Sequence, residues 1–304
     1  MSTFVGKQHQ HFMFDRDNPP ALRVQVGAEV TFETLDACCG TVRSIDQFMQ
    51  MRQEQRRCGP LTGPVFVEGA HAGDTLVVEI VRVKLDADGF QLIGPDRAIV
   101  QDEIPDWTCY VVAVQGERLK LSNGIELPIN PVIGTFGNAP VGKPVKDANR
   151  LGGNQDIPAV RTGAKLHIPV EVDGALFSLG DVHACQGDGE VVGAPEIGAQ
   201  VTVRLSLLNG EQNDWFMIED ETDWHTACPG SNEYDAARQA IFHNARFISQ
   251  SYGIELKDAL IILTMIGRVS ISRTGAWGQF RRVVCSSFSK QVVANAVTKY
   301  HSSA

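Results

Sequence analysis

Apolar and polar residues alternate along most of the first two-thirds of the chain. The segments LRVQV and EVTFET follow one another, with Gly27 at the turn between them. GPVFVE leads through a turn at 72–74 into a long alternating segment that begins at Thr75 and ends near Leu85. Because successive side chains of a strand point to opposite faces, these patterns predict half-buried strands.

Further segments of the same kind follow, each bounded by Gly, Asn or Asp: CYVVAVQ, AKLHIPVEV, ALFSL, QVTVRLSL and DWFMIE. The pattern predicts at least nine strands with few helical intervals between them. Such an order is typical of an antiparallel sandwich or barrel. The segment 133–151 is rich in Gly and Pro and predicts a long loop, a kind of segment that often carries function.

The last third of the chain has a helical pattern instead. Apolar residues recur at helical spacing in NEYDAARQAIFHNARFISQSYG, where Asn232 can cap the first turn and Gly253 can end the helix. A second helix is predicted over 256–266, and RRVVCS predicts a returning strand. We therefore expect one domain over 1–304, with a β-sandwich over about 1–220 and a smaller α+β part over about 221–304.

Charge and cysteine content narrow the class of protein. The 304-residue chain has a net charge of −9, which gives no reason to expect binding to nucleic acid or to an anionic membrane. No apolar segment is long enough to span a bilayer. The seven cysteines form no C-x-x-C pair, so reduced thiols and a cytoplasmic location are expected.

The densest group of polar residues follows the strand ALFSL, in GDVHACQGDGE. In an extended segment Asp181 and His183 lie on one face. A turn at the following glycines would bring Gln186, Asp188 and Glu190 back towards them. A histidine with several carboxylates suits a divalent ion, although QGDGE is also the composition of an ordinary hairpin turn.

Three other segments offer candidate site residues. LGGNQD places Asn154 and Asp156 on one face beside the flexible Gly153, or forms a simple Gly-rich turn. FETLDACCG offers Asp36 as a metal ligand, and QDEIPDW offers Glu103, although an acidic loop is usually only solvated.

Several catalytic motifs are missing from the sequence. It contains no G-x-S-x-G, no H-E-x-x-H, no Walker loop and no G-x-G-x-x-G that opens a helix. The remaining chemistry is activation of water by a metal, with carboxylates and one histidine. A covalent mechanism through Cys38, Cys39 or Cys185 stays an alternative, although a free cysteine is usually a small buried apolar residue.

The motifs taken together resemble the acetamidase/formamidase family. The segments FDRDNPPALRVQVGAEVTFETLDACCG, GPVFVEGAHAGDTLVVEI, LGGNQDI and GALFSLGDVHACQGDGEVVG occur in this order, and IGRVSISR and RRVVCSSFSK also fit. The resemblance implies hydrolysis of short aliphatic amides such as formamide or acetamide to carboxylate and ammonia. It also implies a jelly-roll-like β-sandwich, a divalent metal (zinc or calcium) and a homo-oligomer.

The resemblance also points to individual residues. The acidic and histidine positions of the family correspond to Asp36, Asp156, Asp181, His183, Asp188 and Glu190. Among these and their neighbours we assign Asp36, Asp156, Asp181 and His183 to the metal. We assign Glu190, Asp188 and Gln186 to the proton transfers, and Asn154, Gly153 and Glu103 to the substrate.

The sequence departs from the family pattern near the expected site, at Leu151, Pro158, Thr41 and Val182. These changes keep two alternatives open. One is hydrolysis of a bulkier or cyclic amide, or of another C–N bond. The other is a β-sandwich that binds a metal or an amide without turnover.

Overall fold

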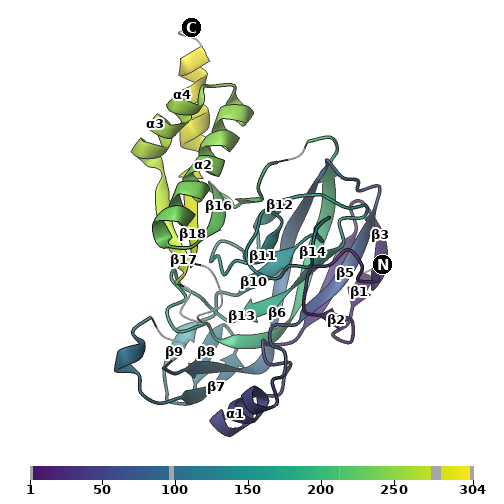
Figure 1. Cartoon of the computed structure of the whole chain (residues 1–304), viewed down its shortest axis with the longest axis vertical. Helices are drawn as coiled ribbons and strands as arrows, with labels where there is room; N and C mark the ends of the chain where they lie inside the picture. Colours follow the sequence, from purple (N-terminus) through teal and green to yellow (C-terminus); the bar gives the residue numbers. More distant parts are fainter. Residues whose placement is uncertain (1–2, 96–98, 212, 275–281, 302–304) are drawn as a thin grey trace.

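The alternating segments form strands in the computed structural model, which describes residues 3–95, 99–211, 213–274 and 282–301. The strands up to the predicted boundary are β1 (Thr3–Val5), β2 (Gln10–His11), β3 (Leu22–Gln25), β4 (Glu29–Thr34), β5 (Leu61–Glu68), β6 (Thr75–Ile93), β7 (Thr108–Gln115), β8 (Arg118–Leu121), β9 (Glu126–Pro128), β10 (Val132–Gly137), β11 (Gly152–Asn154), β12 (Lys165–Pro169), β13 (Phe177–His183), β14 (Glu196–Leu208) and β15 (Met217–Glu219). The expectation of a mostly β fold is confirmed (Figure 1).

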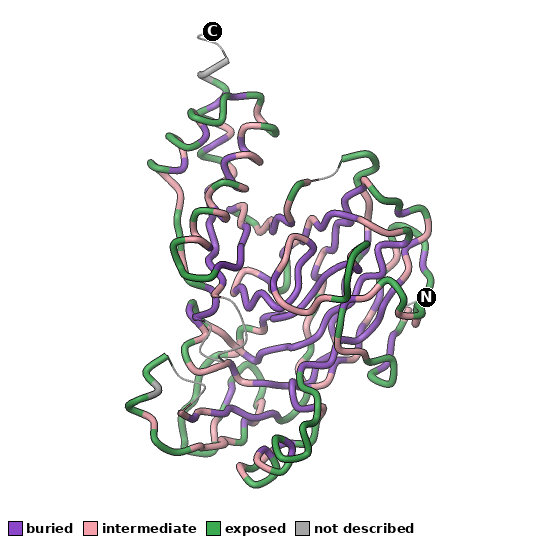
Figure 2. Tube along the Cα trace, in the orientation of Figure 1, coloured by how far each residue is buried: buried purple, intermediate pink, exposed green. Residues whose placement is uncertain are grey.

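The strands of this region form two sets that face one another. In one set β14 pairs with β4 and β6, and β12 continues the ladder beside β6. In the other set β13 lies between β10 and β5. Phe32 of β4 and Phe177 of β13 pack edge to face between the two sets, with ring centroids 5.9 Å apart. Buried residues follow these strands, and exposed residues are concentrated in the loops (Figure 2).

The two sets are joined where β13 meets β14. Their one register pair is His183 with Glu196, at the end of the first strand and the start of the second. Most pairings are antiparallel, as expected, but β1–β4 and β3–β5 are parallel. The long strand β6 continues beyond the predicted end near Leu85 and carries the ladder of β7, β8 and β9.

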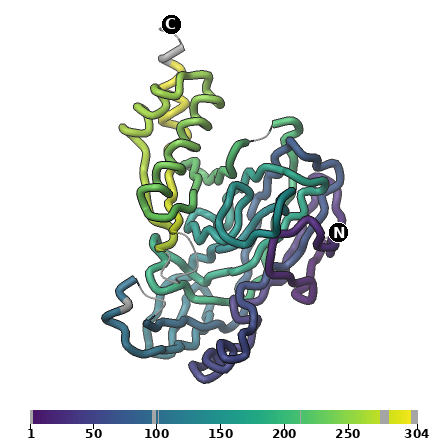
Figure 3. Tube along the Cα trace, viewed as in Figure 1, coloured from purple at the N-terminus to yellow at the C-terminus, as the bar shows by residue number. Residues whose placement is uncertain are grey.

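The C-terminal part contains the two predicted helices. Helix α2 (Glu233–Tyr252) begins after Asn232, whose side chain accepts a hydrogen bond from the Asp235 amide, and ends at Gly253 with φ 64°. Helix α3 (Leu256–Ile266) has the predicted bounds. The helices pack on β16 (Asp223–Gly230) and β18 (Arg282–Ser289). Strand β17 (Arg268–Arg273) pairs with β18, and α4 (Lys290–His301) follows β18. These helices stand at one end of the molecule (Figure 3).

The loop expected over 133–151 is wrong for its first five residues. They belong to β10, all six residues of which are buried. A strand covered on both faces has no polar alternation, so its IGTFG sequence was not distinguishable from a Gly-rich loop. The sequence pattern also did not predict two helices, α4 and α1 (Ile45–Gln53), the second of which is capped by the Ser44 side chain. A short 3₁₀ turn, η1, spans Gln101–Glu103.

The sheet continues across the predicted boundary near residue 220. Strand β15 pairs with β12 on one side and with β16 on the other, so hydrogen bonds link the sandwich with the C-terminal part. The single domain over 1–304 stays a prediction. No helix among the described residues has both the length and the apolar character needed to cross a membrane.

Replacement of Phe177 tests the packing between the two sets. Phe177→Ala removes a fully buried ring and should lower the free energy of unfolding by about 3–5 kcal/mol, measured by urea denaturation. Phe4→Ala is the control, because Phe4 is 51% exposed and its loss should cost less than about 0.5 kcal/mol. Equal effects of the two changes would contradict this account of the core.

Candidate active site

Strand β10 positions the residues of the densest polar motifs. It pairs with β11 on one side and with β13 on the other. The Gly134 carbonyl accepts hydrogen bonds from the Gln155 and Asp156 amides, just beyond β11. Asp181 and His183 lie at the end of β13. The LGGNQD and GDVHACQGDGE motifs therefore meet across one strand, although Asp156 and Asp181 are 25 residues apart in the chain.

The His183 ring is held in one orientation by Gln186. The Gln186 Nε2 donates to the Asp156 carbonyl at 2.6 Å, which turns its Oε1 towards His183 Nδ1 at 2.7 Å. A carboxamide oxygen only accepts, so Nδ1 carries the hydrogen. In the neutral ring Nε2 is then the atom with the free lone pair. It is buried and has no hydrogen-bond partner, which is the arrangement of a metal-ligating histidine with its supporting residue.

Two aspartates face this nitrogen. Asp156 uses Oδ2 to accept a bond from Arg273 at 3.3 Å, whereas its buried Oδ1 has no hydrogen-bond partner. Asp181 accepts a bond from the Thr135 hydroxyl at 3.0 Å, and its other oxygen lies 3.8 Å from His183 Nε2. One ligand atom from each of Asp156, Asp181 and His183 lies within 4.8 Å of the others. This cluster is compatible with a divalent metal.

Both aspartates have unusual backbone conformations. Asp156 has φ 51° and Asp181 has φ 58°, in the left-handed region that non-glycine residues rarely adopt. Such strain persists only where the surrounding structure imposes it, and it is concentrated at functional sites. The positive φ of Asp181 interrupts the regular alternation on which the sequence prediction relied, and Asp181 has no register partner in β10.

Gly134 leaves the space that the cluster occupies. A Cβ atom at this position would lie 2.5 Å from Asp156 Oδ1 and 2.9 Å from His183 Cε1. The absence of a side chain on β10 therefore lets the carboxylate and the imidazole approach the strand together.

A cavity of about 80 Å³ opens beside the cluster. It is lined by Ala37, Cys58, Gly59, Lys146, Asn154, Asp156, Asp181, Glu190, Glu196 and Arg273. Glu196, at the junction of the two strand sets, places Oε1 3.8 Å from His183 Nε2. The Asn154 side-chain oxygen is buried without a hydrogen-bond partner. The cavity thus combines four carboxylates with two cationic side chains and an amide.

The charges in the cavity shift the protonation of its members. Burial raises the pKa of Glu190 well above its usual range, and the Asp156 charge adds to this effect. Burial also raises the pKa of Asp156, against the influence of Arg273. Burial opposes the His183 cation, but Asp181 and Glu196 outweigh it and raise the pKa of the imidazole well above its usual value.

Asp181 behaves differently from the other acids. Burial acts to raise its pKa, but His183, Lys146 and the Thr135 hydroxyl hold the pKa at about 2. The buried acids are thus stabilised by neighbouring cations or by uptake of protons. A cation bound among them would serve the same purpose, because an uncompensated buried charge is costly.

Some predicted site residues lie outside this cluster. The buried Asp36 carboxylate accepts bonds from Arg43 at 2.8 Å and from the Cys38 and Gly40 amides, so the structure brings only its neighbour Ala37 to the cavity. Asp188 is exposed and faces a separate cavity, and Glu103 is exposed on η1.

The other predicted residues contribute in different ways. Glu190 and Asn154 line the cavity, and Gln186 orients His183. Gly153 acts through its backbone, since its φ is 89° and a Cβ would lie 2.3 Å from the Asp147 carbonyl oxygen. Of the two glycines expected to make the turn after Gln186, only Gly189 has a positive φ.

No role was predicted from the sequence for Lys146, Glu196, Arg273 or Gly134. Arg273 is 2% exposed and comes from β17 in the C-terminal part. It donates to the Asn154 carbonyl, to Asp156 and to Asp147. The only signal for it was its place at the end of the quoted IGRVSISR segment, and no spacing rule connects that segment with the LGGNQD motif.

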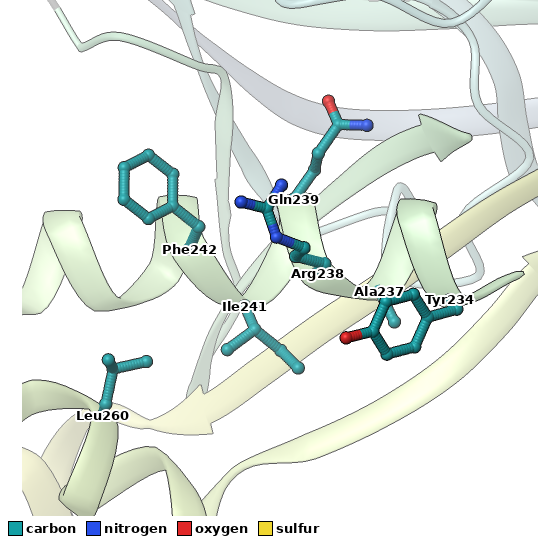
Figure 4. Close-up of a pocket in the computed structure, with 7 residues that line it drawn as sticks. All are labelled: Tyr234, Ala237, Arg238, Gln239, Ile241, Phe242 and Leu260. Atoms are coloured by element: carbon teal, nitrogen blue, oxygen red, sulfur yellow. The ribbon is translucent and has the colours of Figure 1, made fainter. Parts of the chain in front are cut away.

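Two other features of the surface are poor candidates for the chemistry. Asp220, Asp223 and His225 form a second cluster of ligand atoms, but Arg268 pairs with Asp223 at 2.8 Å and backbone amides bind Asp220. A groove of about 540 Å³ on α2 and α3, shown in Figure 4, is lined by Arg238 and otherwise by uncharged residues. Neither combines acids with an unpaired imidazole.

The contribution of Arg273 can be measured by its removal. Arg273→Met leaves buried Asp156 without its cation and should lower the free energy of unfolding by about 3–5 kcal/mol in urea denaturation. Arg282→Met is the control, because its ion pair with Glu233 is exposed and worth at most about 1 kcal/mol. If both variants were equally stable, Arg273 would not be holding the site together.

The space above Gly134 provides a second test. Gly134→Ala should abolish binding of a divalent metal in a titration followed by calorimetry, because the new methyl group displaces the Asp156 carboxylate and the imidazole. Gly142→Ala should bind as the wild type does, since its Cβ would have nothing within 4 Å. Unchanged affinity in Gly134→Ala would show that the metal does not bind at this cluster.

Comparison with known proteins gives the family. The model of the Acetamidase/Formamidase family matches residues 3–151 and 138–222. An acetamidase of Mycolicibacterium smegmatis is 25% identical over 268 residues, which are 66% of each chain. A putative formamidase of Schizosaccharomyces pombe is 25% identical over 272 residues, 68% of this chain and 66% of the relative. The chain thus aligns with slightly less than two thirds of these curated relatives.

A solved structure extends the likeness to nearly the whole chain. The crystal structure of an acetamidase from Bacillus halodurans superimposes with a TM-score of 0.87 at 27% identity, and the match covers 96% of this chain and 99% of that one. The chain belongs to the acetamidase/formamidase family.

Proposed function

We propose that this chain hydrolyses short linear amides, such as formamide and acetamide, to a carboxylate and ammonia. The observation that carries the proposal is a group of buried atoms without hydrogen-bond partners at one small cavity. Asp156 Oδ1 and Asn154 Oδ1 belong to residues that line it, and His183 Nε2 lies next to it, 3.8 Å from Asp181 and from Glu196. The family membership supports the same reaction. Buried polar atoms without partners are rare in native proteins and call for a ligand.

His183, Asp156 and Asp181 would hold a divalent ion. One imidazole nitrogen with carboxylate oxygens suits zinc, whereas calcium is bound mostly by oxygen. A bound ion would supply Lewis-acid polarisation of the amide and a lowered pKa for an attacking water. Gln186 and Thr135 keep the imidazole and the Asp181 carboxylate oriented for this role.

Glu190 is the proposed proton carrier. It lines the cavity beside Asp156 and Asp181. Burial raises its pKa, which favours the protonated form that delivers a proton to the leaving nitrogen. Glu190 would take a proton from the attacking water and deliver it to the departing nitrogen. Asn154 would accept a hydrogen bond from the substrate N–H through its unpaired oxygen.

A short substrate agrees with the small cavity, whose volume is about 80 Å³. A bulkier or cyclic amide stays the alternative, and a panel of amides scored by ammonia release would separate the two. A thiol nucleophile gains no support, because burial raises the pKa of Cys39 and of Cys185 and so disfavours the reactive thiolate.

We also propose a cytoplasmic homo-oligomer. No disulfide joins the seven cysteines, which all lie in the described part of the chain, as suits a reducing compartment. Exposed apolar side chains on α3 and β17, among them Ile261, Met265 and Val269, support contact with a second copy.

The function is tested by ammonia release from formamide and acetamide. The purified chain should release ammonia, lose this activity on chelation and regain it when zinc is added. The non-catalytic alternative predicts metal binding without ammonia release from any amide of the panel. Activity that resists complete removal of metal would overturn the role proposed for the ion.

The proton carrier is tested by Glu190→Gln. Loss of the carboxyl group should lower kcat for acetamide by about 10²–10⁴, with metal content unchanged. Asp188→Asn is the matched control, since Asp188 lies in the same loop but is exposed and faces another cavity. A large effect of Asp188→Asn with none of Glu190→Gln would transfer the role to Asp188.

A further inference from the structure

Lys146 is a partly buried lysine in the wall of the cavity. It lies between β10 and β11, and its Nζ donates to the carbonyl oxygens of Cys58 at 2.7 Å and Gly59 at 2.6 Å. Gly59 has φ 64°, and a Cβ there would lie 2.3 Å from Nζ. The turn before β5 is therefore shaped to let the ammonium group approach its backbone.

The two carbonyl bonds leave part of the ammonium group available. An ammonium group has three N–H donors, and the carbonyls of Cys58 and Gly59 take two of them. The remaining donor belongs to a group that lines the cavity together with Asn154 and Glu190. Burial lowers the pKa of Lys146, against the attraction of Asp181 and Glu196.

The charge of Lys146 is not needed to bind the two carbonyls, which a neutral side-chain amide could also do. It compensates the nearby Asp181 and Glu196 carboxylates, whose attraction opposes the effect of burial on its pKa. An ammonium group in the cavity wall can also use its third donor to stabilise negative charge that develops on a ligand there.

We propose that Lys146 binds the carbonyl oxygen of the substrate amide and stabilises the negative charge that this oxygen gains as water adds to the carbonyl carbon. Lys146 keeps its proton throughout, and no covalent bond to it forms or breaks. Donors fixed where charge develops are among the strongest sources of catalysis. Asn154, which accepts, and Lys146, which donates, would together set the direction of the bound amide. This inference rests on the proposed amidase function.

Lys146 should also bind the carboxylate product. This product places an oxygen where the amide oxygen was. Acetate is therefore expected to inhibit the wild-type chain competitively, and more weakly after the positive charge is removed.

The test compares Lys146→Met with Lys143→Met in the metal-loaded full chain. Lys146→Met should lower kcat for acetamide by about 10²–10³ and raise the inhibition constant for acetate, while metal content stays equal to that of the wild type. Lys143 lies in the same segment but is exposed, so its loss should change neither quantity.

The outcomes separate this inference from the proposed function. A Lys146→Met variant with wild-type kcat and wild-type acetate inhibition would overturn it. The inhibition constant reports only on folded enzyme, so it remains decisive if the variant is less stable. A lower kcat with unchanged acetate inhibition would also contradict it, since Lys146 would then act only through the 58–59 turn. A wild-type chain without any amidase activity would refute the proposed function itself.

Discussion

The crowding of four carboxylates around one imidazole is the constraint on which the rest of the site depends; three of them are buried and Glu190 is partly buried. Asp156, Asp181, Glu190 and Glu196 lie together at the junction of the two strand sets, where water is largely excluded. Coulombic repulsion in such a place is weakly screened. Arg273, Lys146 and the Thr135 hydroxyl reduce this repulsion by binding or attracting the aspartates, and burial raises the pKa of Glu190. A divalent ion fits the same requirement.

The fold supplies the rigid frame that holds these charges. Strand β10 lies between the two motifs and has no side chain at Gly134, where Asp156 and His183 approach it. The hydrogen-bonded core keeps Asp156 and Asp181 in backbone conformations they would not adopt alone. The C-terminal part contributes Arg273, which links Asp156 to Asp147 and to the Asn154 carbonyl. The helical end of the molecule is thus connected to the site through one strand.

Whether a predicted site residue takes its expected place depends on how far along the chain its contact partners lie. Gln186 and His183 are three residues apart, and the expectation that they meet holds because a local turn controls it. Asp36 is just as acidic, yet Arg43, seven residues further on, takes its carboxylate. Asp188 lies between Gln186 and Glu190 but is exposed. The backbone turns through left-handed conformations at Gly189 and Glu190, and simple alternation does not predict where side chains point in such a turn.

Local rules were sufficient for most of the architecture. The strand pattern, the caps of α2 and the bounds of α3 depend on residues within a few positions of one another, so the sequence alone determined the mostly β fold, the helical end and the motif that contains His183. The buried strand β10 and the roles of Gly134, Lys146 and Arg273 depend on contacts between distant segments. Only the tertiary structure decided them, because burial and charge pairing arise from which strands become neighbours, and no short-range pattern records that choice.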